Sequence, residues 1–335
     1  MVQQQEVLDK IIKLYPLALL FLVLTLIISH FFYTVLNPVF IGKEKEIYIK
    51  PGMKIKDIGF LLEKEGIIKS RFYFNLITTI KKSKIKAGFY KFYGFYNIFK
   101  VIEELEGGGK GIKITIPEGK TLKEIEKIFA NNGFKVNFSN YQLKHTDNEI
   151  LKKYFSSDSS LEGFLFPDTY EFYKEDNEKT IINKLVNNFE KKALSEILKN
   201  ENLNPYETLI LASIVEKEAK KESDFPVIAG ILLKRLKNEK PLEADATLVY
   251  YKCQYIFCDY ELKISDLKED HPYNTYKYKN LPPTPISNPS ILAIKSVINP
   301  VTTDYWYYLT DKEGNAHYAK TLKEHQENIK KYLKK

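Results

Sequence analysis

A run of 21 residues without Asp, Glu, Lys or Arg, 16–36, constrains the fold of this 335-residue chain more than any other feature. At about 1.5 Å per residue, a helix of that length spans roughly 30 Å, the thickness of a hydrocarbon core. A cleaved signal peptide would have a shorter apolar stretch and an Ala-x-Ala-like site, and neither is present. The sequence therefore predicts a short N-terminal tail, 1–15, and one uncleaved transmembrane helix, 16–36.

The formal charge of +8 comes almost entirely from Lys, since Arg71 and Arg235 are the only arginines. Proteins that recognise nucleic acids rely on the planar guanidinium fork, so we expect no nucleic-acid partner. More lysines follow the apolar run closely than precede it. The positive-inside rule therefore does not support a cytoplasmic N-terminus, and charge alone leaves the orientation open.

Residues 49–67 and 116–134 repeat one pattern at a constant offset of 67 residues. Apolar residues and two glycines fall on equivalent positions in both copies, and the apolar residues have helical spacing. Each copy predicts a short strand, a Gly turn and a helix that ends at a second Gly. The Gly-rich stretch 106–111 predicts a linker between the small α+β modules.

The stretch LEGFLFPDTYEF, 161–172, places four aromatic residues around a Pro-Asp turn. One interpretation is a buried turn in which Asp168 caps the following segment. The other is the wall of a cleft, because aromatic faces stack on sugar rings. Phe166, Asp168 and Tyr170 are therefore candidate substrate contacts.

The stretch ASIVEKEAKKESDF, 212–225, looks like a charged surface helix. On a helix running over 207–221, Leu211, Ile214 and Val215 form one apolar face, and Glu218 projects from the middle of it. A carboxyl on such a face is paired, protonated or in a cleft. Burial would raise its pKa towards the range that a general acid needs at neutral pH. The alternative is an exposed Glu218 beyond the helix end, or a structural ion pair.

Three later segments carry further candidates. A helix in 225–251 contains Arg235 near its end and leads into a polar turn with Asp245. A long Tyr- and Pro-rich loop, 271–300, follows. Residues 304–329 predict a strand, a Gly-Asn hairpin, a second strand and a helix.

Six motifs follow one another along the chain in this order: LEGFLFPDTY, LASIVEKEA, VIAGILLKRL, LEADATLVY, YNTYKYKNLPPTPISNPS and HYAKTLKEHQENI. Together they resemble the YceG-like family of bacterial endolytic murein transglycosylases. The resemblance covers nearly the whole chain. It implies an α+β fold with a LysM-like module, 45–110, a second small α+β connector, 111–155, and a catalytic domain, 156–335. It also implies a lyase that cuts peptidoglycan glycan strands between N-acetylmuramic acid and N-acetylglucosamine and leaves 1,6-anhydro ends.

Within this resemblance, Glu218 matches the second glutamate of the family's Glu-Lys-Glu triplet and would be the sole general acid and base. The candidate substrate-binding residues are Asp245, Tyr273, Asn274, Thr275, Tyr276, Phe166, Asp168, Tyr170 and Arg235. The chain departs from the family where Glu243, Ala244, Asp245 and Ala246 replace a usual Gln-Ser/Thr-Asp-Pro. The resemblance places the enzyme in the cytoplasmic (inner) membrane, with its catalytic domain on the periplasmic side and peptidoglycan synthases as candidate partners.

The expected chemistry needs no cofactor or metal, since the second step is an attack by the sugar's own hydroxyl. The cysteines, Cys253 and Cys258, do not form a zinc pattern with the histidines, and a disulfide between them is left open.

Two alternatives for the function remain. One is a membrane-anchored glycan-binding protein without catalysis, and the other is a hydrolase that uses Glu218 and Asp245 as a carboxylate pair.

Overall fold

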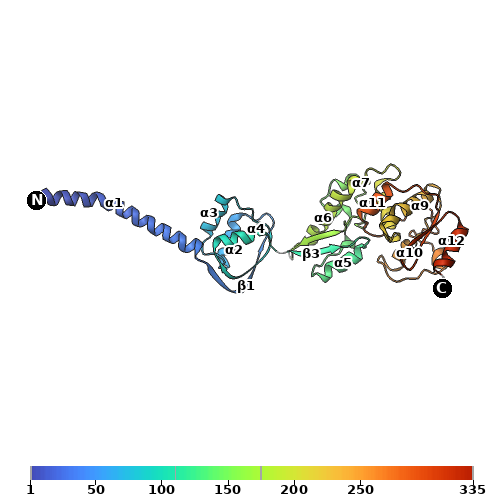
Figure 1. Ribbon diagram of the computed structural model, residues 1–335, viewed down its shortest axis with the longest axis horizontal. Helices are drawn as coiled ribbons and strands as arrows, with labels where there is room; N and C mark the ends of the chain where they lie inside the picture. The colour runs from blue at the N-terminus through green and yellow to red at the C-terminus, as the bar shows by residue number, and fades with distance from the viewer. Residues whose placement is uncertain (1, 110, 174–175, 334–335) are drawn as a thin grey trace. The chain divides into compact units, whose positions relative to one another are not determined.

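The computed structural model describes residues 2–109, 111–173 and 176–333. The chain has a mixed α+β architecture and divides into two compact units, Met1–Gly111 and Ile112–Lys335 (Figure 1). The expected α+β fold with one N-terminal apolar helix is therefore confirmed.

Unit 1 begins with helix α1 (Val2–Phe31), which continues into the short helix η1 (Phe32–Leu36). Within it, Tyr15–Leu36 is long and apolar enough to cross a membrane, and most of its side chains are exposed. Residues 2–15, expected as a short N-terminal tail, are helical as well. They contain neither Gly nor Pro, so nothing interrupts the helix before Pro16. Met1 lies outside the described residues.

The rest of unit 1 is a two-stranded antiparallel sheet covered by three helices. Strand β1 (Val39–Ile49) pairs with β2 (Gly88–Tyr96). The helices are α2 (Ile55–Lys64), α3 (Arg71–Lys81) and α4 (Ile98–Gly107). Aliphatic and aromatic side chains from all five elements form a core of their own, which includes Ile47, Leu62, Phe74, Phe92 and Val101.

The two copies of the repeated pattern fold as predicted, each within its own unit. Strand β1 leads through Gly52 into α2, and strand β3 (Ile112–Ile116) leads through Gly119 into α5 (Leu122–Asn131). Both glycines have positive φ, +77° and +69°, a conformation that favours Gly. The glycines that follow the two helices also have positive φ, as expected at this position.

Unit 2 contains the remaining elements. Strand β3 pairs antiparallel with β4 (Asp168–Phe172), and β5 (Tyr307–Thr310) pairs with β6 (Ala316–Ala319) in the predicted hairpin. The longer helices are α6 (Glu178–Phe189), α8 (Pro205–Glu218), α9 (Phe225–Lys237), α10 (Asp245–Lys252), α11 (Ile291–Ile298) and α12 (Leu322–Asn328). The short helices are η2 (Phe138–Asn140), η3 (Leu143–His145), η4 (Leu151–Lys153), η5 (Glu190–Leu194), α7 (Ser195–Ile197), η6 (Glu222–Asp224), η7 (Asp266–Lys268) and η8 (Ile329–Leu333).

Helix α8 lies in the centre of this unit and packs against α9 and α11. Asn204 caps its first turn and Pro205 occupies the first helical position, which explains why the helix begins there. It ends at Glu218, three residues before the predicted end, because Ala219 is extended. The residues from Thr208 to Val215 are buried on all sides, so only the first and last turns reach a surface.

Glu162 is a buried carboxyl that ties the second copy of the repeat to the rest of unit 2. Its oxygens accept hydrogen bonds from the Leu122 N–H at the start of α5 (3.2 Å), the Tyr250 hydroxyl (2.9 Å) and Asn288 Nδ2 (3.1 Å). The expected connector, 111–155, lies within the larger unit from Ile112 onward. Burial raises the pKa of Glu162 to about 8, although the hydrogen bonds from Leu122 and Tyr250 act in the opposite direction.

The raised pKa of Glu162 predicts a pH-dependent stability. The folded protein keeps this proton up to about pH 8, whereas the unfolded chain loses it near the ordinary value of 4.5. Stability is thus highest below the unfolded pKa and falls as pH rises, by up to about 1.4 kcal/mol per pH unit. We expect Glu162→Gln to make this slope shallower between pH 6 and 8, measured by denaturant unfolding of the full chain in detergent.

The matched control for this measurement is Glu149→Gln, because the Glu149 side chain is 77% exposed. This control should leave the slope as in the unsubstituted chain. An identical slope in Glu162→Gln would contradict the role given to the buried carboxyl.

Candidate active site

The last turn of α8 opens into a cavity of about 860 Å³ that contains Glu218. The wall is formed by residues from the end of α8, from α9 and α10, from the β5 strand and from the C-terminal helices. They are Lys217, Glu218, Lys220, Arg235, Glu243, Asp245, Ala246, Val249, Phe257, Tyr276, Tyr307, Tyr308, Leu309, Thr310, Leu322, His325, Ile329 and Leu333.

Two donors from distant parts of the chain hold the Glu218 carboxyl. The Tyr308 hydroxyl, on β5, donates to Oε2 at 3.1 Å, and the Ala246 N–H, in the first turn of α10, lies 3.4 Å from Oε1. Burial, followed by the nearby charge of Asp245, raises the pKa of Glu218 to about 7. A large fraction of these carboxyls therefore carries a proton at neutral pH, which is the state that a general acid requires.

Asp245 is the second carboxyl of the cavity. It is the first residue of α10 and is exposed to solvent. The Tyr276 hydroxyl donates a hydrogen bond to its Oδ1. Burial and the charge of Asp245 raise the pKa of Tyr276, so this phenol remains a donor. The structure thus brings together four of the residues singled out in the sequence, Glu218, Asp245, Tyr276 and Arg235.

Arg235 also lines the cavity, but its guanidinium donates hydrogen bonds mainly to other groups of the chain. Nε donates to the Trp306 carbonyl at 2.8 Å, and Nη1 donates to the Leu242 carbonyl at 2.7 Å and to Glu243 at 2.9 Å. Its guanidinium carbon lies 5.2 Å from the centre of the Tyr307 ring. Only 7% of the side chain is exposed. Arg235 therefore braces the segments that carry Asp245 and Tyr308.

The other residues expected from the 271–300 loop lie behind the cavity wall. Tyr273, Asn274 and Thr275 are buried. Asn274 Nδ2 donates to the Glu269 carbonyl at 2.8 Å, and Thr275 Oγ1 accepts from the Ala244 N–H at 3.1 Å. These contacts shape the loop so that Tyr276 alone, among the four consecutive candidates, lines the cavity.

Phe166, Asp168 and Tyr170 do not line the cavity of Glu218. Phe166 and Tyr170 are buried in the core, and the Tyr170 hydroxyl donates to the Phe166 carbonyl at 2.6 Å. Lys192 pairs with Asp168 at 2.7 Å and lowers the pKa of that carboxyl. The turn leads into β4, which pairs with β3, and this pairing directs the Phe166 and Tyr170 side chains into the hydrophobic core.

Lys217 and Phe257 belong to the cavity wall but were not singled out by the sequence. Lys217 Nζ lies 3.8 Å from the centre of the Phe257 ring and donates to the Gly119 carbonyl at 3.2 Å. Phe257 lies in a loop closed by a disulfide between Cys253 and Cys258, the bond that the sequence left open. Nothing in the local sequence of Phe257 or Tyr308 indicates that either side chain lines the cavity of Glu218.

The described residues contain no group of three or more His, Cys, Asp or Glu side chains placed to hold a metal ion.

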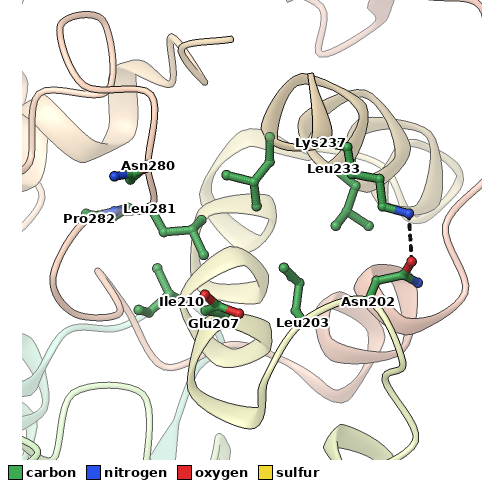
Figure 2. A pocket seen from close by; sticks show the side chains of 10 residues that line it. Asn202, Leu203, Glu207, Ile210, Leu233, Lys237, Asn280, Leu281 and Pro282 are labelled. Atoms are coloured by element: carbon green, nitrogen blue, oxygen red, sulfur yellow. Dashed lines mark hydrogen bonds between the residues drawn. The ribbon is translucent and has the colours of Figure 1, made fainter. Parts of the chain in front are cut away.

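A second cavity, of about 630 Å³, lies beside the first half of α8 (Figure 2). It is lined by apolar side chains such as Ile210 and Leu281, and Lys237 donates to Asn202 across it at 2.6 Å. Its carboxyl, Glu207, accepts a hydrogen bond from the Asn204 N–H and so caps the start of α8.

Residues 47–331 match the sequence model of the YceG-like family. The chain belongs to this family. The protein named endolytic murein transglycosylase in Bacillus subtilis (strain 168) is 31% identical over 314 residues, which cover 86% of this chain and 84% of the relative. The one so named in Streptococcus pneumoniae (strain D39) is 29% identical, and the matched region spans 58% of its length.

A crystal structure of a YceG-like protein from Listeria monocytogenes has a related fold. It is 27% identical to this chain and superposes with a TM-score of 0.53. The match covers 86% of this chain and 99% of the other.

The contacts of Glu218 predict opposite pKa shifts for two substitutions. Tyr308→Phe removes a hydrogen bond that favours the charged carboxylate, so the pKa of Glu218 should rise above its present value. Asp245→Asn removes a negative charge that disfavours the carboxylate, so this pKa should fall. Carbon-13 NMR of labelled glutamate carboxyl groups would measure both, and shifts in the same direction would contradict this arrangement.

Proposed function

We propose that the chain is a membrane-anchored endolytic lytic transglycosylase that cleaves peptidoglycan strands between N-acetylmuramic acid and N-acetylglucosamine. The observation that carries the proposal is the Glu218 carboxyl. It occupies the family's motif position, lies in a cavity large enough for sugar rings, and has a pKa raised to about 7. The names of the relatives support the same reaction class.

The proposed reaction uses one carboxyl twice. Protonated Glu218 donates its proton to the glycosidic oxygen as the bond from that oxygen to C1 of the muramic sugar breaks. The resulting carboxylate accepts the proton of the C6 hydroxyl, whose oxygen forms the new bond to C1 and closes the 1,6-anhydro ring. The proton count balances without water, and Tyr308 and the Ala246 N–H stabilise the carboxylate between the two steps.

Asp245 can support the positive charge that develops at C1, because it lies at the same cavity as Glu218. The same placement favours a second candidate, a hydrolase in which the two carboxyls act as a pair. The products distinguish the two reactions. Hydrolysis gives a reducing muramic end that is heavier by one water than the anhydro end, so mass spectrometry of digested peptidoglycan decides between them.

For the proposed acid, we predict that Glu218→Gln lowers turnover of purified peptidoglycan by about 10² to 10⁴-fold, the contribution of a general acid and base. The substitution keeps the shape of the side chain and removes its titrating proton. Unchanged thermal unfolding would show that the variant still folds. Turnover of the unsubstituted enzyme should fall as pH rises through about 7, since the first step needs the protonated carboxyl.

Glu216→Gln is the matched control, two residues earlier on the same helix. Glu216 accepts hydrogen bonds from the backbone N–H and the hydroxyl of Ser290 and does not line the cavity. Its glutamine variant keeps an acceptor for Ser290 and should lose much less activity. Equal losses in both variants, or anhydro products from Glu218→Gln, would refute the assignment. If the unsubstituted chain binds glycan but does not cleave it, the result favours the alternative of a glycan-binding protein without catalysis.

We further propose that residues 16–36 anchor the enzyme and that the part after this span lies outside the cytoplasm. Residues 45–110 would be a LysM-like module that holds glycan near the catalytic domain or sets its distance from the membrane. The separate hydrophobic core of unit 1 supports a module of this kind. The proposed catalytic domain is 156–335, joined in one compact unit by the preceding 112–155.

The anchor predicts a simple fractionation result. The full chain should sediment with membranes and should be released by detergent but not by high salt, because apolar burial and not charge holds it there. Release by salt alone would contradict a transmembrane span. A C-terminal reporter that is active only in the cytoplasm would contradict the proposed orientation.

A further inference from the structure

Helix α3 of unit 1 has an apolar outer face in addition to its buried inner face. The inner face, with Phe74 and Thr78, packs in the core of the unit. The outer stripe of α3 consists of Phe72, Leu76 and Ile80, which are 66%, 42% and 74% exposed. At about 100° per residue, their spacing of four places them within an arc of about 80°. A helix on a soluble surface would carry polar residues there. The described side chains of unit 1 leave this stripe largely uncovered.

The same helix contacts the end of the membrane-spanning segment. The Tyr73 ring lies 5.5 Å from the ring of Phe31, edge to face. Just before α3, Lys69 Nζ donates to the Tyr33 carbonyl at 3.3 Å and lies over the Tyr33 ring. Figure 1 shows α3 next to the point where α1 enters the folded part of unit 1. Because Phe31 and Tyr33 belong to the last turns of the apolar span, these contacts place α3 at the level where the span leaves the bilayer.

The charges and aromatics around the stripe fit a lipid surface. Lys82 and Lys84, just beyond the C-terminal end of α3, form no ion pair with any residue that the structure describes. Four residues after the span, the Phe40 ring lies 4.8 Å from the tilted ring of Phe95 on the neighbouring strand, and both residues are 62% exposed. Apolar stripes flanked by lysines, together with exposed aromatics, are typical of surfaces that enter the boundary between headgroups and acyl chains.

We propose that the outer stripe of α3 docks on the bilayer beside the anchor helix, with the lysines contacting anionic lipid headgroups. The proposal rests on the proposed anchoring of the chain. The docked stripe, together with the span, fixes the orientation of unit 1 on the membrane surface. Unit 1 is then attached to the membrane by two elements, the anchor helix and the outer stripe of α3.

The test places a tryptophan in the stripe of the full chain. Leu76→Trp is reconstituted in vesicles of phosphatidylcholine and phosphatidylglycerol whose acyl chains are brominated near the headgroup. Bromine quenches indole only at close range, and the emission of Trp306 is subtracted with the unsubstituted chain. We expect the emission of the introduced indole to fall by about two-fold or more relative to unbrominated lipid, as for interfacial helices.

Two matched variants complete the experiment. Lys50→Trp places the probe in the exposed turn after β1, at the end of the strand away from the span, about 30 Å from its start. This control should not be quenched. Adding Phe72→Ser and Ile80→Ser to the Leu76→Trp chain should abolish the quenching, while the chain stays in the vesicles through its anchor.

The outcomes separate the two proposals. A chain that inserts into vesicles but shows equal quenching at positions 76 and 50 overturns the docking surface and leaves the anchor intact. If the introduced indole is not quenched by bromine because it is buried in a self-associated chain, the docking surface is likewise overturned. The stripe would then contact a second copy of the chain and not lipid. A chain that fails to insert at all overturns both.

Discussion

The desolvation of one carboxyl organises the larger unit of this protein. Glu218 ends a helix whose middle turns are fully buried, and an unpartnered charge at that position would be costly. Protonation and hydrogen bonds from Tyr308 and the Ala246 N–H reduce this cost. These partners come from the C-terminal hairpin and from α10, so the hydrogen bonds that hold the carboxyl require both elements to be in place. Arg235 connects the same two elements through its contacts with Trp306 and Leu242.

A second buried carboxyl, Glu162, explains why one copy of the repeated strand–turn–helix pattern belongs to the catalytic unit. It joins the start of α5 to Tyr250 and Asn288. The Gly119 turn of this copy also accepts a hydrogen bond from Lys217, the neighbour of Glu218. The first copy packs on a core of its own within unit 1. The same local pattern thus serves as a separate module in one place and as part of the proposed active-site scaffold in the other.

The proposed location of the chain agrees with two independent features. The Cys253–Cys258 disulfide suits an oxidising compartment outside the cytoplasm. Lys82 and Lys84, which follow α3, have a role on a lipid surface if α3 docks there. The proposed docking would also explain why α3 is apolar on two faces. Both features concern residues outside the family's catalytic motifs.

The sequence by itself determined the features that depend on neighbouring residues. The apolar helix, the glycine turns of the repeat and the direction of Glu218 on α8 follow from helical periodicity and from the backbone freedom of Gly, which act over a few residues. Tertiary structure decided which distant side chains surround Glu218. Tyr308 is 90 residues away and Phe257 is held by a disulfide loop, whereas Phe166 and Tyr170 turn into the core because β4 pairs with β3. Local patterns cannot encode these contacts, because they depend on how strands pair and helices pack across the whole unit.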